Sequence, residues 1–180
     1  MKNILIALAS MLILAGCKKS VDELPEPTQS GANTFGLKLN GEFWVPQTFA
    51  GINAPILKAQ LMGSNVNDLL ITAQNFASEP LESQFNLYVK NITGTGTYEL
   101  NQNTGFYPNV SSSYAYYVRR KINPLNEWIT SAQNTGSVII TKWDVQNGIV
   151  SGTFEFRAGS MDNSAEPITV TDGRFDIKLQ

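Results

Sequence analysis

Apolar and polar residues alternate with a period of two along most of the chain beyond residue 34, and Gly, Asn, Asp or Pro interrupts each alternating run. Alternation of this kind is typical of strands with one buried face, because successive side chains of a strand point to opposite faces. We find no persuasive 3.6-residue apolar stripe of an amphipathic helix. The pattern therefore predicts an all-β domain of about nine or ten strands, at 35–39, 42–45, 56–62, 68–74, 84–90, 97–100, 114–118, 137–143, 149–156 and 168–179.

Two dipeptides predict how strands are joined or bent. Asn40 and Gly41 separate the first two strands, and both accept the positive φ of a type I′ turn. A two-residue hairpin at this point would place Leu37 opposite Trp44. Asp172 and Gly173 predict either a second hairpin turn or a glycine bulge within one bent strand.

The phase of each strand predicts which side chains enter the core. In strand 84–90 the odd-numbered residues are expected to point inward and the even-numbered ones, which include Asn86 and Tyr88, outward. Strand 137–143 has apolar residues in both phases, as a central strand covered on both faces would. These features favour two antiparallel sheets packed as a β-sandwich, and a closed antiparallel barrel is the alternative.

The N-terminal residues predict export and a lipid anchor. Residues 1–3 form a short basic start, residues 4–14 are apolar, and Leu-Ala-Gly precedes Cys17. An apolar run of this length is too short to span the ~30 Å hydrocarbon core of a bilayer, and the pattern is that of a lipoprotein signal peptide. We expect a signal peptide at 1–16, lipid on Cys17, a flexible tether over 17–34 and one β-sandwich domain over 35–180.

Composition narrows the partners and the chemistry. Thirteen Lys and Arg against fifteen Asp and Glu give a net charge of −2, with no basic stripe to neutralise phosphates, so nucleic acid is not an expected partner. With no histidine and one cysteine, the chain cannot build a His-based triad, a His-ligated metal site or a disulfide within itself. We expect neither a metal nor a cofactor. The expected location is the outer membrane, on its periplasmic or cell-surface face.

Three segments carry a resemblance to known proteins: FGLKLNGEFW after the tether, GSVIITKWDVQNGIVSGTFEF in the middle and ITVTDGRFDIK near the end. With them, the chain resembles a family of uncharacterised small lipoproteins of Bacteroidota. In the middle segment, a "G-x-v-x-I-T" strand followed by "v-S-G-T-F-x-F", the glycines and phenylalanines are spaced as in those proteins. The resemblance implies a membrane-anchored β domain lipidated at Cys17 and assigns no catalytic or binding residue.

An aromatic cluster is the candidate binding surface. Flat rings interleaved with hydrogen-bonding residues are typical of sugar- and protein-binding surfaces, since tyrosine offers a large contact area at low entropic cost. The alternative is that these rings pack against the faces of a strand. The candidate platform for a glycan or an envelope protein consists of Phe106, Tyr107, Tyr114, Tyr116 and Tyr117.

No residue set predicts a nucleophile with its general base, so we expect a noncatalytic binding or accessory module and no enzyme. A glycoside hydrolase with two carboxylates is the alternative, because the separation of such carboxylates is set in space and not in sequence. Most acids fall at outward strand phases or turn ends, where solvated carboxylates are expected; examples are Glu42, Glu99, Glu155 and Asp176.

Overall fold

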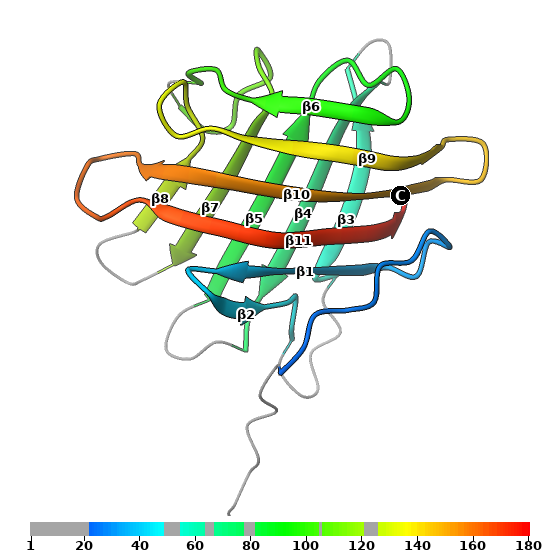
Figure 1. Cartoon of the computed structure of the whole chain (residues 1–180), viewed down its shortest axis with the longest axis horizontal. Coiled ribbons are helices and arrows are strands. Elements are labelled where there is room, and N and C mark those ends of the chain that lie inside the picture. The colour runs from blue at the N-terminus through cyan, green and yellow to red at the C-terminus, as the bar shows by residue number, and fades with distance from the viewer. Residues whose placement is uncertain (1–21, 49–54, 64–66, 78–81, 105, 121–125) are drawn as a thin grey trace, which may run out of the picture.

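The computed structural model describes residues 22–48, 55–63, 67–77, 82–104, 106–120 and 126–180, so Cys17 and the predicted signal peptide lie outside the described residues. Within these ranges the chain forms strands and no helix, and all pairings between the strands are antiparallel (Figure 1). The all-β antiparallel prediction is confirmed. The strands are β1 (Thr34–Leu39), β2 (Glu42–Trp44), β3 (Leu57–Met62), β4 (Asp68–Asn75), β5 (Glu82–Val89), β6 (Gly96–Leu100), β7 (Tyr114–Arg120), β8 (Asn126–Ile129), β9 (Gly136–Asp144), β10 (Ile149–Ser160) and β11 (Ile168–Lys178).

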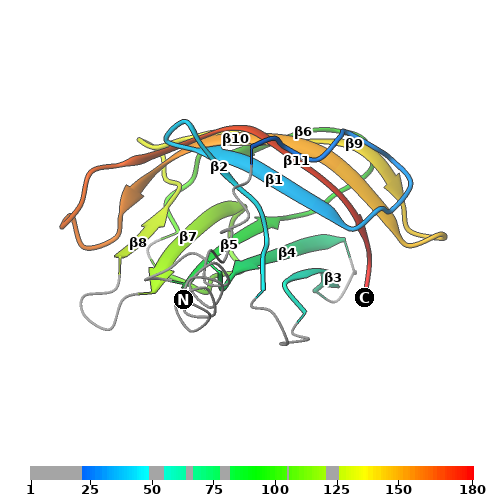
Figure 2. The same ribbon diagram turned by 90° about the horizontal axis from the view of Figure 1, so that it is seen from below.

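These strands form one strongly curled sheet. Its order is β2-β1-β11-β10-β8-β7-β5-β4-β3, and β9 pairs with β10 and with β6. Strand β10 joins two layers, because most of it pairs with β9 and β11 while Gly159 and Ser160 at its end pair with β8. Figures 1 and 2 show the resulting half-barrel, in which the layer of β6, β9, β10, β11, β1 and β2 crosses the layer of β8, β7, β5, β4 and β3. The finer choice between sandwich and closed barrel stays a prediction.

The predicted turn chemistry is observed. Asn40 and Gly41 have φ angles of 50° and 90°, as a type I′ turn requires, and Leu37 pairs with Trp44 as expected. Asp172 has φ 55° inside the continuous strand β11, and the register with β10 shifts between Phe154 and Phe156. Of the two readings of Asp172-Gly173, the bulge in one bent strand is therefore correct.

Glycines allow the layer around β10 to bend. Three phenylalanines of β10 and β11 each lie opposite a glycine of the neighbouring strand: Phe156 with Gly136, Phe175 with Gly152, and Phe154 with Gly173. A methyl group on any of these glycines would fall 2.2–2.7 Å from the facing phenylalanine. The aromatic side chains thus occupy the space that a side chain on the neighbouring strand would need, as is usual where strands coil strongly.

The main core fills the space between the two layers. It is rich in side chains of the inward phases, among them Leu37, Ile71, Phe85 and Phe154, all at most 3% exposed. Strand β9 is covered on one face only, because Val138 and Ile140 are buried while Ile139 is 42% exposed. Our prediction that both faces of this strand are covered is therefore wrong; its second apolar phase faces outward.

The layer of β5 and β7 is buried on both faces. Asn86 and Tyr88 in β5, expected to point into solvent, are each 2% exposed. Tyr88 belongs to a second apolar cluster on the outer face of this layer, separate from the main core. The phase assignment was right, but the assumption that the outer phase is solvated was wrong. Sequence analysis also missed β8, which brings the buried Trp128 into the main core.

Candidate functional site

The predicted aromatic platform is mostly a packed cluster. Tyr114 and Tyr116 lie in the outer cluster with Tyr88 and are 2% and 3% exposed. Tyr117, in the opposite phase of β7, lies in the main core, where its ring stacks on Phe85 with 4.4 Å between the centroids. Neither face of β7 therefore presents an open tyrosine ring to a ligand.

The loop before β7 closes the outer face. The ring of Tyr107 stacks on that of Tyr116 at 3.8 Å with 4° between the planes, and it meets Tyr114 edge-on at 6.0 Å. Phe106, at 63%, is the one exposed member of the predicted platform. The prediction of a five-ring platform is thus wrong. Tyr107 packs over Tyr114 and Tyr116, and Tyr117 lies in the main core, so none of these three rings is open to a ligand.

The hydroxyl groups of two buried tyrosines donate hydrogen bonds to carboxylates. Tyr88 Oη donates to Asp68 at 2.6 Å, and Tyr116 Oη donates to Glu127 at 2.9 Å. Burial, and then these carboxylates, raise the pKa of both tyrosines well above its usual value. Burial also raises the pKa of Tyr114 to about 12. The hydrogen bonds and the burial identify these rings as structural.

We expect the cluster to titrate only when the fold opens. A tyrosine with a raised pKa stabilises the fold fully below its ordinary pKa of 10.0, and this contribution is lost as the pH rises toward about 12. The ultraviolet absorbance of tyrosinate in the native protein should therefore lag behind that of the urea-unfolded chain. Ionisation of most tyrosines near pH 10.0, with native circular dichroism retained, would contradict the packed cluster.

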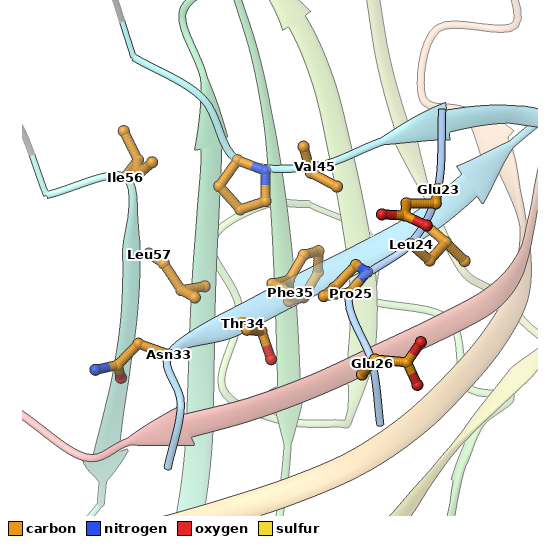
Figure 3. Close-up of a pocket in the computed structure, with 11 residues that line it drawn as sticks. Glu23, Leu24, Pro25, Glu26, Asn33, Thr34, Phe35, Val45, Ile56 and Leu57 are labelled. Carbon is orange, nitrogen blue, oxygen red and sulfur yellow. The ribbon is translucent and has the colours of Figure 1, made fainter. Parts of the chain in front are cut away.

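A groove opens between the layers where β1 and β3 face each other (Figure 3). Its volume is about 420 Å³, within the range of ligand and peptide pockets. Phe35, at 3% exposure, lies on one side, and the half-buried Val45, Ile56 and Leu57 complete an apolar wall. The remaining lining residues are Glu23, Leu24, Pro25, Glu26, Asn33, Thr34 and Pro46. None of these residues was singled out from the sequence.

Two backbone bridges flank the groove, and acidic side chains line its rim. At one end Gln47 bridges to Asn75 of β4, and at the other Leu179 bridges to Ala59 of β3. The charged side chains that line it, Glu23 and Glu26, take part in none of the salt bridges found in the described ranges. In Figure 3 the carboxylate of Glu23 points toward the side of Val45 and Phe35, whereas that of Glu26 points away from Leu57.

A buried carboxylate holds the segment that forms this rim. Asp176 of β11 is 1% exposed and accepts hydrogen bonds from the backbone N–H groups at 30–32, at 2.8–3.0 Å, and from the hydroxyls of Thr28 and Ser151 at 2.6 and 2.7 Å. We call these contacts the Asp176 clasp. Burial opposes ionisation of Asp176, but the hydrogen bonds outweigh it and hold the pKa of this carboxyl well below its usual range.

The clasp corrects two sequence predictions. Asp176 occupies the outward phase of β11, yet it is not solvated, because residues 28–32 lie over it. From Leu24 on, the described part of the predicted tether is docked on the sheet. The Pro25 ring lies where Gly36 has no side chain, and Asn33 Oδ1 accepts from Lys178 N at 2.9 Å. The docking could not be predicted from the sequence, because this segment has few apolar side chains and makes most of its contacts through backbone groups.

Among the described residues, no three Asp or Glu side chains gather in a way that could hold a metal ion. Among the same residues, no helix is long and apolar enough to cross a membrane.

Comparison with known proteins gives one match. No curated protein and no solved structure matches the chain. The match is to the sequence model of a domain of unknown function (DUF6252), which covers residues 33–176 and hence β1 to β10 and nearly all of β11. This agrees with the resemblance to an uncharacterised family. The lipoprotein signal before Cys17 and the Bacteroidota origin stay predictions. The chain belongs to the DUF6252 family.

Proposed function

We propose that the protein is an envelope lipoprotein whose β domain is a noncatalytic binding module, held at the outer membrane by lipid on Cys17. The N-terminal sequence supports the anchor, since a basic start, an apolar run and Leu-Ala-Gly-Cys follow in the order of a lipoprotein signal. More than one acyl chain makes such attachment effectively permanent.

The observation that carries the binding role is the groove between β1 and β3. Its rim is formed by residues 23–26, which directly follow the segment that leads from the proposed lipid. The seven Cα-to-Cα steps from Cys17 to Leu24 can extend over at most about 25 Å. The Asp176 clasp fixes the chain beyond that point. A partner in the groove would therefore be held close to the membrane surface.

Two further features favour a protein partner and a noncatalytic role. Glycan recognition by stacked rings loses its support, since Tyr114, Tyr116 and Tyr117 are buried. Asp176, the most buried acid of the described residues, has both oxygens occupied by hydrogen-bond donors, so neither serves as a nucleophile or a general acid. Glu42, Glu99 and Glu155, which the sequence predicts to be solvated, are exposed.

Cys17→Ser tests the anchor. The variant should keep its signal peptide and lose acylation, because the thiol is the group that accepts the lipid. Fractionation of cells and mass spectrometry of the purified chain report both effects. Wild-type protein with an unmodified Cys17 thiol in the membrane fraction would contradict the anchor. Lys18→Ser, next to the lipidation position, is the matched control and should be processed like the wild type.

A further inference from the structure

In the part of the chain that the structure describes, the edge of β3 that borders the groove is open. The N–H of Gln74 donates to the carbonyl of Ile56 at 2.7 Å, so the even-numbered residues of this region turn their peptide groups toward β4. The odd-numbered residues turn theirs the other way, as the bond from Gln180 N to the carbonyl of Ala59 confirms. The N–H and C=O of Leu57 therefore point to the groove side, where no strand of the described chain pairs with β3.

The open edge is short and has an apolar wall beside it. The bridges at Gln47 and Ala59 limit it to the region around Leu57. Between residues 55 and 59 a strand advances about 13 Å, enough for a few residues of a partner strand. In an extended segment alternate side chains point to opposite sides, so one side chain would meet Phe35, Val45 and Ile56 while its neighbours point toward the mouth of the groove, which residues 23–26 border.

The acidic residues of the groove indicate which type of partner segment it would bind. The charged lining residues are acidic, and the Glu23 carboxylate points toward the apolar wall in Figure 3. A lysine or arginine next to the apolar side chain of the partner would be attracted to Glu23, whereas an acidic residue would be repelled. The net charge of −2 on the chain favours approach of a basic partner as well.

We propose that an extended, basic segment of a partner protein binds in this groove by adding a strand to β3 at Leu57, with an apolar side chain against Phe35 and a cationic one at Glu23. Strand addition takes its affinity from main-chain hydrogen bonds and its specificity from alternate side chains. This proposal rests on the proposed binding function and names the partner class of the same groove.

The test uses the full chain, purified from membranes in detergent, and fluorescence anisotropy of a labelled hexapeptide of alternating Lys and Val. The alternating Glu and Val hexapeptide should bind at least about tenfold more weakly. Alternate N-methylation of the basic peptide, which removes the N–H groups that would pair with β3, should abolish binding. Lipid vesicles and soluble glycans, added as competitors, should not displace the basic peptide.

Three variants locate the binding. Glu23→Gln should weaken it about threefold or more, while Glu26→Gln removes the same charge from an outward side chain and should stay within about twofold. Leu57→Pro removes the edge N–H and no bond to β4, so it should lose binding with circular dichroism unchanged. If that variant does not fold, N-methylation and the glutamate pair decide the question.

The outcomes separate the two proposals. Equal binding of the acidic and basic peptides, no effect of N-methylation, or equal effects of the two glutamate variants would overturn strand addition. Loss of peptide binding in Val45→Glu, with no effect of N-methylation, would overturn strand addition and keep the groove as a binding site. Displacement by vesicles or glycans would show a different occupant and overturn the proposal. Absence of peptide binding would also overturn strand addition. The lipid anchor is tested separately, by Cys17→Ser.

Discussion

Asp176→Asn is expected to lower the free energy of unfolding by about 3 kcal/mol, because charge-assisted hydrogen bonds are lost and a buried donor is left unpaired. Oδ2 of Asp176 accepts from Thr28 and from the N–H groups of Ser30 and Ala32, and Oδ1 accepts from Gly31 N–H and Ser151. An amide NH₂ in either position meets a backbone N–H that cannot accept. Whichever way the asparagine turns, part of the clasp is broken.

Urea unfolding measures the loss, and amide hydrogen exchange locates it. The amides of Gly31 and Ala32 should exchange faster in Asp176→Asn, since their acceptor is weakened. Asp172→Asn is the matched control in the same strand. Asp172 is exposed, it has φ 55°, which asparagine tolerates, and its ion pair with Lys38 lies at the surface. Equal unfolding midpoints for the Asp176 variant and the wild type would contradict the clasp.

The effect of Asp176 also depends on pH. A carboxyl whose pKa is lowered by folding stabilises the fold fully above its unfolded pKa, near 3.8, and less as the pH falls below that value. The difference in stability between the wild type and Asp176→Asn should therefore be constant near neutral pH. It should shrink with acidification below about pH 4. A difference that grows with acidification would show that the cause lies elsewhere.

Local patterns predicted the strands because strand formation leaves a local signal. Alternation located ten of the eleven strands, and the type I′ preference of Asn40-Gly41 set the register that places Leu37 opposite Trp44. Strand β8 was missed because it is a four-residue strand, NEWI, with only one fully buried side chain, Trp128, and so shows little alternation.

Two of the wrong predictions share one cause. The outward phase of a strand was taken as solvated, but segments outside that strand cover it at two places. Tyr107 packs over Tyr114 and Tyr116, and residues 28–32 pack over Asp176. The alternation within a strand does not encode such covering. For the same reason the groove could not be predicted, since Glu23, Phe35 and Leu57 come together only through the fold.

Gly152→Ala is expected to lower the free energy of unfolding by about 3 kcal/mol, at the upper end of typical overpacking effects. The added methyl group would lie 2.4 Å from the carbonyl oxygen of Ile139 and 2.7 Å from Cζ of Phe175. Gly152 pairs with Ile140 of β9 on one side and with Phe175 of β11 on the other. Movement of the phenylalanine ring alone cannot relieve the clash, because the nearer atom belongs to the backbone of β9.

Thr153→Ala, at the next position of β10, is the matched control. Thr153 is exposed, so its replacement should cost less than about 1 kcal/mol, the whole range of strand propensity. Urea unfolding of both variants, with circular dichroism of the native states, separates local strain from loss of the fold. If Gly152→Ala unfolds at the same urea concentration as the wild type, the facing glycine and phenylalanine pairs do not hold the curl of the sheet. A loss confined to Gly152→Ala would show that the ring of Phe175 and the backbone of β9 need the space that Gly152 leaves free.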